Sequence, residues 1–144
     1  MPATPQIRLL SGFETLPFGA NPAKAKDLFG APDEESTLED EVFNQPKLLW
    51  HYHTTALSLF FDYSGEKHFF SAECKHPDTL LFGEKVIGMN EKTLMDLLKK
   101  YNYPLSEREV LPWGETCLNF DEAGLECYFK NKKLIALVIS AKRD

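Results

Sequence analysis

The feature of the sequence that most constrains its fold is an internal repeat. Residues 18–29 (FGANPAKAKDLF) align with residues 87–98 (IGMNEKTLMDLL), and residues 56–62 (ALSLFFD) align with residues 124–130 (GLECYFK) at an offset that differs by one position. The matched pairs include Gly19 with Gly88, Asn21 with Asn90, Leu57 with Leu125 and Phe61 with Phe129. This agreement in offset indicates a duplicated unit. The alternative is two unrelated units, each a helix followed by a hairpin.

Each copy of the repeat begins with a predicted helix. Asn21 has a side chain that caps helix N-termini, and Pro22 suits the first helical position because the N–H that it lacks has no helical partner there. This helix is predicted to end at Phe29. In the second copy, Asn90 caps a helix predicted over residues 91–102. Its apolar stripe at i, i+3, i+4 and i+7 consists of Leu94, Leu97, Leu98 and Tyr101.

Three alternating segments after each helix predict strands. They span 48–55, 57–61 and 68–74 in the first copy, and 116–120, 125–129 and 134–140 in the second. Short leading strands are predicted at 6–10 and 79–83. The predicted fold class is therefore α+β, with two tandem α-β-β-β repeats, 1–78 and 79–144, in one compact body. We expect an antiparallel sheet with the helices on one face. The segment 134–140 is apolar on both sides, which predicts a central strand covered on both faces.

This layout resembles the β-lactamase-inhibitor-protein-like fold. The residues that carry the resemblance are Gly19, Asn21, LFGAPDE (28–34), LSLFF (57–61), GLECYF (124–129) and KKLIALV (132–138). The resemblance implies tandem α-β repeats that present one curved antiparallel sheet, and a binding scaffold that is commonly non-enzymatic. Known members are mostly secreted or lipidated, whereas a signal peptide and a lipid-anchor cysteine are not predicted here. An inhibitor role does not follow from the fold alone.

Composition narrows the classes of function. The net charge of −6 disfavours nucleic-acid binding, which needs a basic surface, and favours a basic partner. The three cysteines lack C-x-x-C spacing, and we expect Cys74 and Cys127 to be small core residues in a reduced protein. No signal peptide or membrane-spanning segment is predicted, which favours the cytoplasm. No phosphate-binding glycine loop is present either.

The histidines are the first candidate site. His51 and His53 are predicted to share one face of a strand, and His68 follows in a later strand. They favour one alternative function, a metal- or small-ligand-binding enzyme centred on His51, His53 and His68. Because no third ligand lies at a diagnostic spacing, our preferred interpretation has no metal, no cofactor and no catalytic residue. The histidines are then partner-contacting residues.

An acidic run over residues 33–41 is the second candidate site. Its carboxylates are Asp33, Glu34, Glu35, Glu39, Asp40 and Glu41. A run of like charges is typical of a solvated loop, and we predict a loop here. As a binding element, it would attract a basic partner and accelerate association at low salt.

The third candidate is the sheet face that the helices leave open. If Trp50, Leu59 and Phe61 point to the helices, alternation turns the neighbouring residues outward. The predicted partner-contacting residues on this face are His51, His53, Phe60, Phe69 and Tyr128. The sequence therefore predicts a non-enzymatic cytoplasmic protein-binding module, of the immunity or inhibitor type, for a basic protein. A second alternative is a self-associating structural module, in which a homodimer closes this face.

Overall fold

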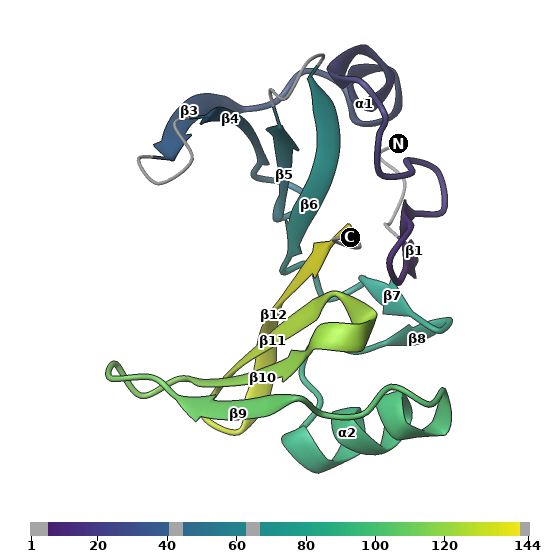
Figure 1. The fold of residues 1–144 in the computed structure, drawn as a ribbon, viewed down its shortest axis with the longest axis vertical. Helices are drawn as coiled ribbons and strands as arrows, with labels where there is room; N and C mark the ends of the chain where they lie inside the picture. Colours follow the sequence, from purple (N-terminus) through teal and green to yellow (C-terminus); the bar gives the residue numbers. More distant parts are fainter. Residues whose placement is uncertain (1–5, 41–44, 63–66, 142–144) are drawn as a thin grey trace.

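The computed structural model describes residues 6–40, 45–62 and 67–141 (Figure 1). In the first half of the chain the elements are β1 (Gln6–Arg8), β2 (Gly12–Phe13), α1 (Pro22–Phe29), β3 (Glu34–Asp40), β4 (Gln45–Tyr52), β5 (Leu57–Asp62) and β6 (His68–Cys74). In the second half they are β7 (Leu80–Leu81), β8 (Glu84–Lys85), α2 (Glu91–Lys100), β9 (Glu107–Val110), β10 (Thr116–Phe120), the short 3-10 helix η1 (Asp121–Ala123), β11 (Leu125–Lys130) and β12 (Lys133–Ser140).

The main sheet has eight strands in the order β3-β4-β5-β6-β12-β11-β10-β9, and every neighbouring pair is antiparallel. β6 and β12 pair in the middle, with Ser71 opposite Ser140 and Cys74 opposite Leu137. This pairing joins a meander from the first half to a meander from the second. In Figure 1 the β3–β4 and β9–β10 hairpins form the two outer ends of the sheet. The α+β class and the antiparallel sheet are confirmed.

Each half has four main-sheet strands after its helix, whereas the sequence predicted three. The additional strand in the first half is β3, so the prediction of an acidic loop there was wrong. Carboxylates are tolerated in β3 because it is an edge strand with solvent beside it. The additional strand in the second half is β9, which forms the opposite edge and which alternation did not reveal.

The leading segments form a separate small sheet with the order β2-β1-β7-β8. β1 and β7 are parallel in this sheet, with Gln6 opposite Leu80 and Ile7 opposite Leu81. The predicted leading strands therefore exist, but they pair with each other and lie outside the main sheet. This pairing links the segment that precedes α1 to the segment that precedes α2.

Both helices begin where their capping residues predict. The Asn21 side chain accepts a hydrogen bond from the Lys24 N–H at 3.0 Å, and Asn90 does the same for Thr93 at 2.8 Å. α1 ends before Gly30, whose φ of 82° suits glycine. α2 ends at Lys100, two residues earlier than predicted.

The core lies between the helices, the small sheet and one face of the main sheet, which we call the inner face. Its residues form one hydrophobic cluster, to which α1 contributes Ala25 and α2 contributes Leu94, Leu97 and Leu98. From each strand, the side chains on one side of the alternation enter this cluster. Members with at most 1% exposure include Leu57, Leu59, Phe61, Phe69, Leu118, Phe120, Leu134 and Ile139. Both helices therefore share their core with the same face of the sheet.

A β-bulge in each half reverses the alternation, and this overturns one predicted site residue. Phe60 pairs with Ser71 but Phe61 pairs with Phe69, so Phe70 is the extra residue. Phe69 consequently shares the inner face with Phe61 and is 0% exposed, which contradicts its predicted outward position. In β12 the extra residue is Ile135, between the partners of Tyr128 and Phe129.

β12 is central, as predicted, but it is not covered on both faces. Leu134, Leu137 and Ile139 are buried on the inner face, while Ile135 is 36% exposed and Val138 is half-buried on the other side. No helix of the described residues lies over that side (Figure 1). The apolar character of both sides therefore does not reflect a second covering layer.

Candidate partner-binding face

The side of the main sheet that faces away from the helices, which we call the outer face, carries a row of eight residues that are all polar except Val138. The cross-strand register places one residue from each of the eight strands in this row, in the order Glu34, His51, Ser58, Glu73, Val138, Glu126, Asn119 and Glu107. We call it the transverse row. It contains four carboxylates and no lysine or arginine. The row is therefore acidic in composition, although Glu73 is paired with Lys75 and Glu34 with His53.

Phe60 and Tyr128 lie beside this row. Phe60 follows Ser58 by two residues on β5, and Tyr128 follows Glu126 by two residues on β11. Both are half-buried on the outer face, as the sequence predicted. Three antiparallel steps separate β5 from β11, so the two strands run in opposite directions. Phe60 and Tyr128 consequently flank the row on opposite sides.

Tyr128 is held in place by its neighbours on the outer face. Its hydroxyl donates a hydrogen bond to Glu126 Oε2 at 2.7 Å. Partial burial, and then the Glu126 carboxylate, raise the pKa of Tyr128, so its hydroxyl stays protonated and remains a donor. Cys117 is directly opposite Tyr128 in β10 and is only 4% exposed. This cysteine is buried on the outer side of the sheet, whereas Cys74 and Cys127 are buried in the core, as predicted.

The histidine end of the row forms a shallow depression of about 350 Å3. His51 Nδ1 lies 2.8 Å from Ser58 Oγ, and His53 Nε2 lies 3.0 Å from Glu34 Oε2. The hydrogen bond to Glu34 raises the pKa of His53, which favours its protonated form. Glu73 and Lys75, which form a 3.3 Å ion pair, complete the rim of the depression. Both carboxylates of the depression therefore have partners within the protein. His53 is exposed and His51 is half-buried, so both histidines can contact a partner.

His68 does not join the other histidines. It pairs with Asp62 at the far end of β5, whereas His51 pairs with Ser58 near the opposite end of that strand. Four strand positions correspond to about 13 Å. Within residues 6–40, 45–62 and 67–141, no group of three or more histidine, cysteine or acidic side chains has a geometry that could hold a metal ion. The three histidines of the predicted enzyme alternative therefore do not form one centre.

The first two acids of β3, Glu34 and Glu35, lie on opposite faces of the strand. Glu34 faces His51 and contacts His53, whereas Glu35 pairs with Trp50 and accepts the indole N–H at 2.8 Å. Asp33 accepts the backbone N–H of His53 at 2.7 Å. Glu39 and Asp40 lie in the part of β3 that pairs with the beginning of β4, and Glu41 is outside the described residues. Asp33, Glu34 and Glu35 therefore each have a different hydrogen-bond partner within the protein, and the contribution of the run to partner binding stays a prediction.

Sequence reasoning missed Glu73 and Glu107 as members of the row, and it missed the β9–β10 hairpin. These two acids join the row only through the register of the sheet. The exposed apolar residues at the β9–β10 hairpin include Val110 at 64% and Trp113 at 68% exposure. The segment LPWG (111–114) contains a turn signal that could have identified this hairpin.

The sequence matches no protein-family model and no curated protein. Two solved structures resemble the fold, each with a TM-score of 0.50. One is a DUF4309 family protein (YjgB) from Bacillus subtilis subsp. subtilis str. 168, at 15% identity over 85% of this chain and 79% of that chain. The other is an extracellular protein containing a SCP domain from Bacillus anthracis str. Ames, at 16% identity over 88% of this chain and 44% of that chain. At these identities the likeness concerns the fold alone. Among the described residues, no helix is long and apolar enough to cross a bilayer.

Proposed function

We propose that this protein is a non-enzymatic protein-binding module, built from two tandem helix-and-sheet repeats, that binds a basic protein partner on its outer face. The single observation that carries the proposal is the transverse row. This row crosses all eight strands, contains four carboxylates and no lysine or arginine, and passes between Phe60 and Tyr128. Aromatic residues at the centre of a charged surface are typical of binding hot spots.

The tandem-repeat part of the proposal is supported by matching backbone contacts in the two halves. Gly19 donates to the Phe69 carbonyl at 2.8 Å, and Phe69 donates back to Ala20 at 2.8 Å. Gly88 donates to the Leu134 carbonyl at 2.9 Å, and Leu134 donates back to Met89 at 2.8 Å. In each half this contact anchors the segment before the helix to the last strand, one residue before the bulge. Both glycines have positive φ, at 95° and 97°.

These contacts also support the resemblance to the β-lactamase-inhibitor-protein-like fold, in which tandem repeats build a binding sheet. Within the class of binding modules, we propose an immunity- or inhibitor-type protein of the cytoplasm, which neutralises a basic toxin or enzyme. The acidic row supports this choice because it would steer a basic target to the face before contact.

The test is an affinity measurement on a purified partner. The tagged protein is used to capture its partner, which is purified separately and titrated against the wild type and against Phe60→Ala and Tyr128→Ala. Each variant is expected to weaken binding about tenfold or more, as hot-spot truncations do. Glu126→Lys should slow association, and the effect should shrink in high salt. Glu84→Lys, an exposed charge reversal in the small sheet, is the matched control.

Two results would contradict the proposal. One is unchanged affinity in both aromatic variants, which would remove the outer face as the binding surface. The other is a concentration-independent dimer in light scattering that Tyr128→Ala abolishes, because the face would then be closed by a second copy and the self-associating alternative would hold.

A further inference from the structure

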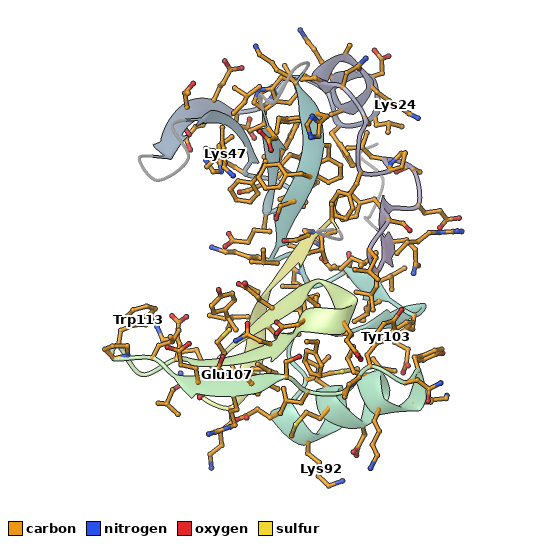
Figure 2. All side chains as sticks on the ribbon, viewed as in Figure 1. Lys24, Lys47, Lys92, Tyr103, Glu107 and Trp113 are labelled. Carbon is orange, nitrogen blue, oxygen red and sulfur yellow. The ribbon has the colours of Figure 1, made fainter. Side chains whose placement is uncertain are left out.

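β9 forms a free edge of the main sheet and leads into an exposed apolar hairpin tip. All four of its residues are exposed, and no strand of the described residues pairs on its far side. Figures 1 and 2 show the β9–β10 hairpin extending away from the body, with Trp113 at its far end. The turn is closed by hydrogen bonds, from the Leu111 N–H to the Glu115 carbonyl at 2.7 Å and from the Gly114 N–H to the Leu111 carbonyl at 3.0 Å. It is therefore an ordered edge with an apolar end.

The backbone of this edge offers hydrogen bonds to an added strand. Because Leu111 donates to Glu115 across the hairpin, the alternation of an antiparallel pair makes Glu109 and Glu107 the residues that bond inward to β10. Arg108 and Val110 then direct their N–H and C=O groups to the free edge. An extended segment of another chain can use these groups by β-augmentation.

The side chains along the edge specify the charge of such a segment. Arg108 faces the inner side and is occupied, since its Nε lies 2.8 Å from Glu91 Oε1. Glu107 and Glu109 face the outer side, and no cation of the described residues lies within ion-pair distance of either one. Among the described residues, the outer side of the edge therefore presents two carboxylates without an ion-pair partner, while Val110 lies on the inner side with Arg108.

A second copy and a membrane both fit this edge poorly. Two copies related by a two-fold axis would pair antiparallel with their outer faces on the same side. The registers centred on Arg108 or Glu109 place Glu107 opposite Glu109 or Glu109 opposite itself, and the register centred on Val110 places Arg108 opposite Pro112, which lacks an N–H. Like charges directly opposite are destabilising. A bilayer with anionic lipids would repel the hairpin, which carries Glu107, Glu109 and Glu115 against the single base Arg108. An extended basic segment fits better, because its backbone can hydrogen-bond to the free edge and its cations can pair with the carboxylates.

We infer that β9 accepts an extended segment of a basic protein as a ninth strand. Lysine or arginine at alternate positions of that segment would face Glu107 and Glu109, and apolar residues would contact Val110 and Trp113. The inference depends on the proposed function only for the basic character of the partner. It shares Glu107 with the transverse row, but it uses the free backbone groups of β9, which the outer-face contacts do not use.

The probe is a synthetic peptide of about eight residues, a usual strand length, that alternates lysine and valine. A peptide that alternates glutamate and valine is its matched control. Binding is followed by the fluorescence of Trp113, since Trp50 is only 7% exposed, and by hydrogen-exchange protection of the Arg108 and Val110 amides. We expect the lysine peptide to bind and to protect both amides, and the glutamate peptide not to bind.

Two edge variants separate the backbone contribution from the charge contribution. Val110→Pro removes an edge N–H without removing a bond to β10, and it should weaken lysine-peptide binding about tenfold. The double variant Glu107→Lys, Glu109→Lys should weaken it about fivefold, as expected for two cross-strand charge pairs, and should admit the glutamate peptide. Glu84→Lys is the charge-reversal control. Thermal unfolding of each variant checks that it is folded.

The inference is overturned if the lysine peptide fails to bind, or if it binds equally well to Val110→Pro. It is also overturned if phosphatidylcholine vesicles, and not the peptide, shift the Trp113 emission, or if sedimentation shows a dimer that Val110→Pro dissociates. Peptide binding that is lost in Phe60→Ala and Tyr128→Ala but kept in Val110→Pro would place the segment on the outer face. That result would overturn the edge inference and leave the proposed function standing.

Discussion

The Trp50 indole N–H donates a hydrogen bond to Glu35 Oε2 across 2.8 Å, from β4 to the edge strand β3. Trp50 is 7% exposed and packs edge-on against Phe61 at 5.1 Å between ring centroids. The bond gives the indole nitrogen a partner where the ring is buried. It also explains why an acidic segment forms a strand, because one of its carboxylates supports the inner face.

Replacing Glu35 with alanine is therefore expected to destabilise the fold. Hydrogen bonds that involve a charged group contribute about 1.5–3 kcal/mol, and the variant leaves the indole N–H without this acceptor. Glu35→Gln retains an acceptor oxygen and should cost less. Urea unfolding followed by tryptophan fluorescence measures both values. Equal stability of Glu35→Ala and the wild type would show that the bond does not hold β3.

A pair of phenylalanine variants tests the bulge in β6. Phe69 is 0% exposed, and its ring centroid lies 5.0 Å from that of Phe18, 5.8 Å from that of Phe13 and 6.1 Å from that of Phe61. Phe69→Ala should cost about 3–5 kcal/mol of unfolding free energy, as large-to-small changes in a core do. Phe70→Ala, at the half-exposed extra residue whose ring lies 4.7 Å from Lys47 Nζ, should cost much less. The reverse order in chemical denaturation would show that plain alternation persists through β6.

The same bulge shows where prediction from the sequence ended. The helix starts were predictable because Asn21 and Asn90 are local signals, and most strands were predictable because alternation is local. A bulge changes the parity of a strand without a residue that marks it, so Phe69 was assigned to the wrong face. The transverse row depends on register between eight strands, and Glu73 and Glu126 carry no local sign of their proximity. β3 and β9 are edges, where charged residues hide the usual strand pattern.

Tyr52 should titrate at unusually high pH. Its hydroxyl donates to the Gly30 carbonyl at 2.9 Å, and burial, followed by the Asp33 carboxylate, raises its pKa to about 12. A pKa above the unfolded value of 10.0 means that the protonated phenol contributes stability below pH 10, which is lost as the pH rises towards 12. Because the pKa of Tyr128 is raised as well, ultraviolet titration should show the Tyr52 component as the difference between wild type and Tyr52→Phe, and this variant should cost about 1 kcal/mol. If the titration is identical in wild type and Tyr52→Phe, Tyr52 ionises outside this range.

His53 should have a raised pKa that depends on Glu34. The hydrogen bond between His53 Nε2 and Glu34 Oε2, at 3.0 Å, favours the imidazolium. Because the folded pKa lies above the unfolded value of 6.5, the contribution of this pair to stability is complete below pH 6.5 and is lost as the pH rises through the folded pKa. Both side chains are more than 60% exposed, so salt should weaken the effect.

NMR titration of the histidine ring protons should show the His53 pKa falling towards 6.5 in Glu34→Gln and in high salt, whereas Glu84→Lys should leave it unchanged. An unchanged His53 pKa in Glu34→Gln would mean that the two side chains are not paired in solution, and Glu34 would then be free to contact a partner at every pH.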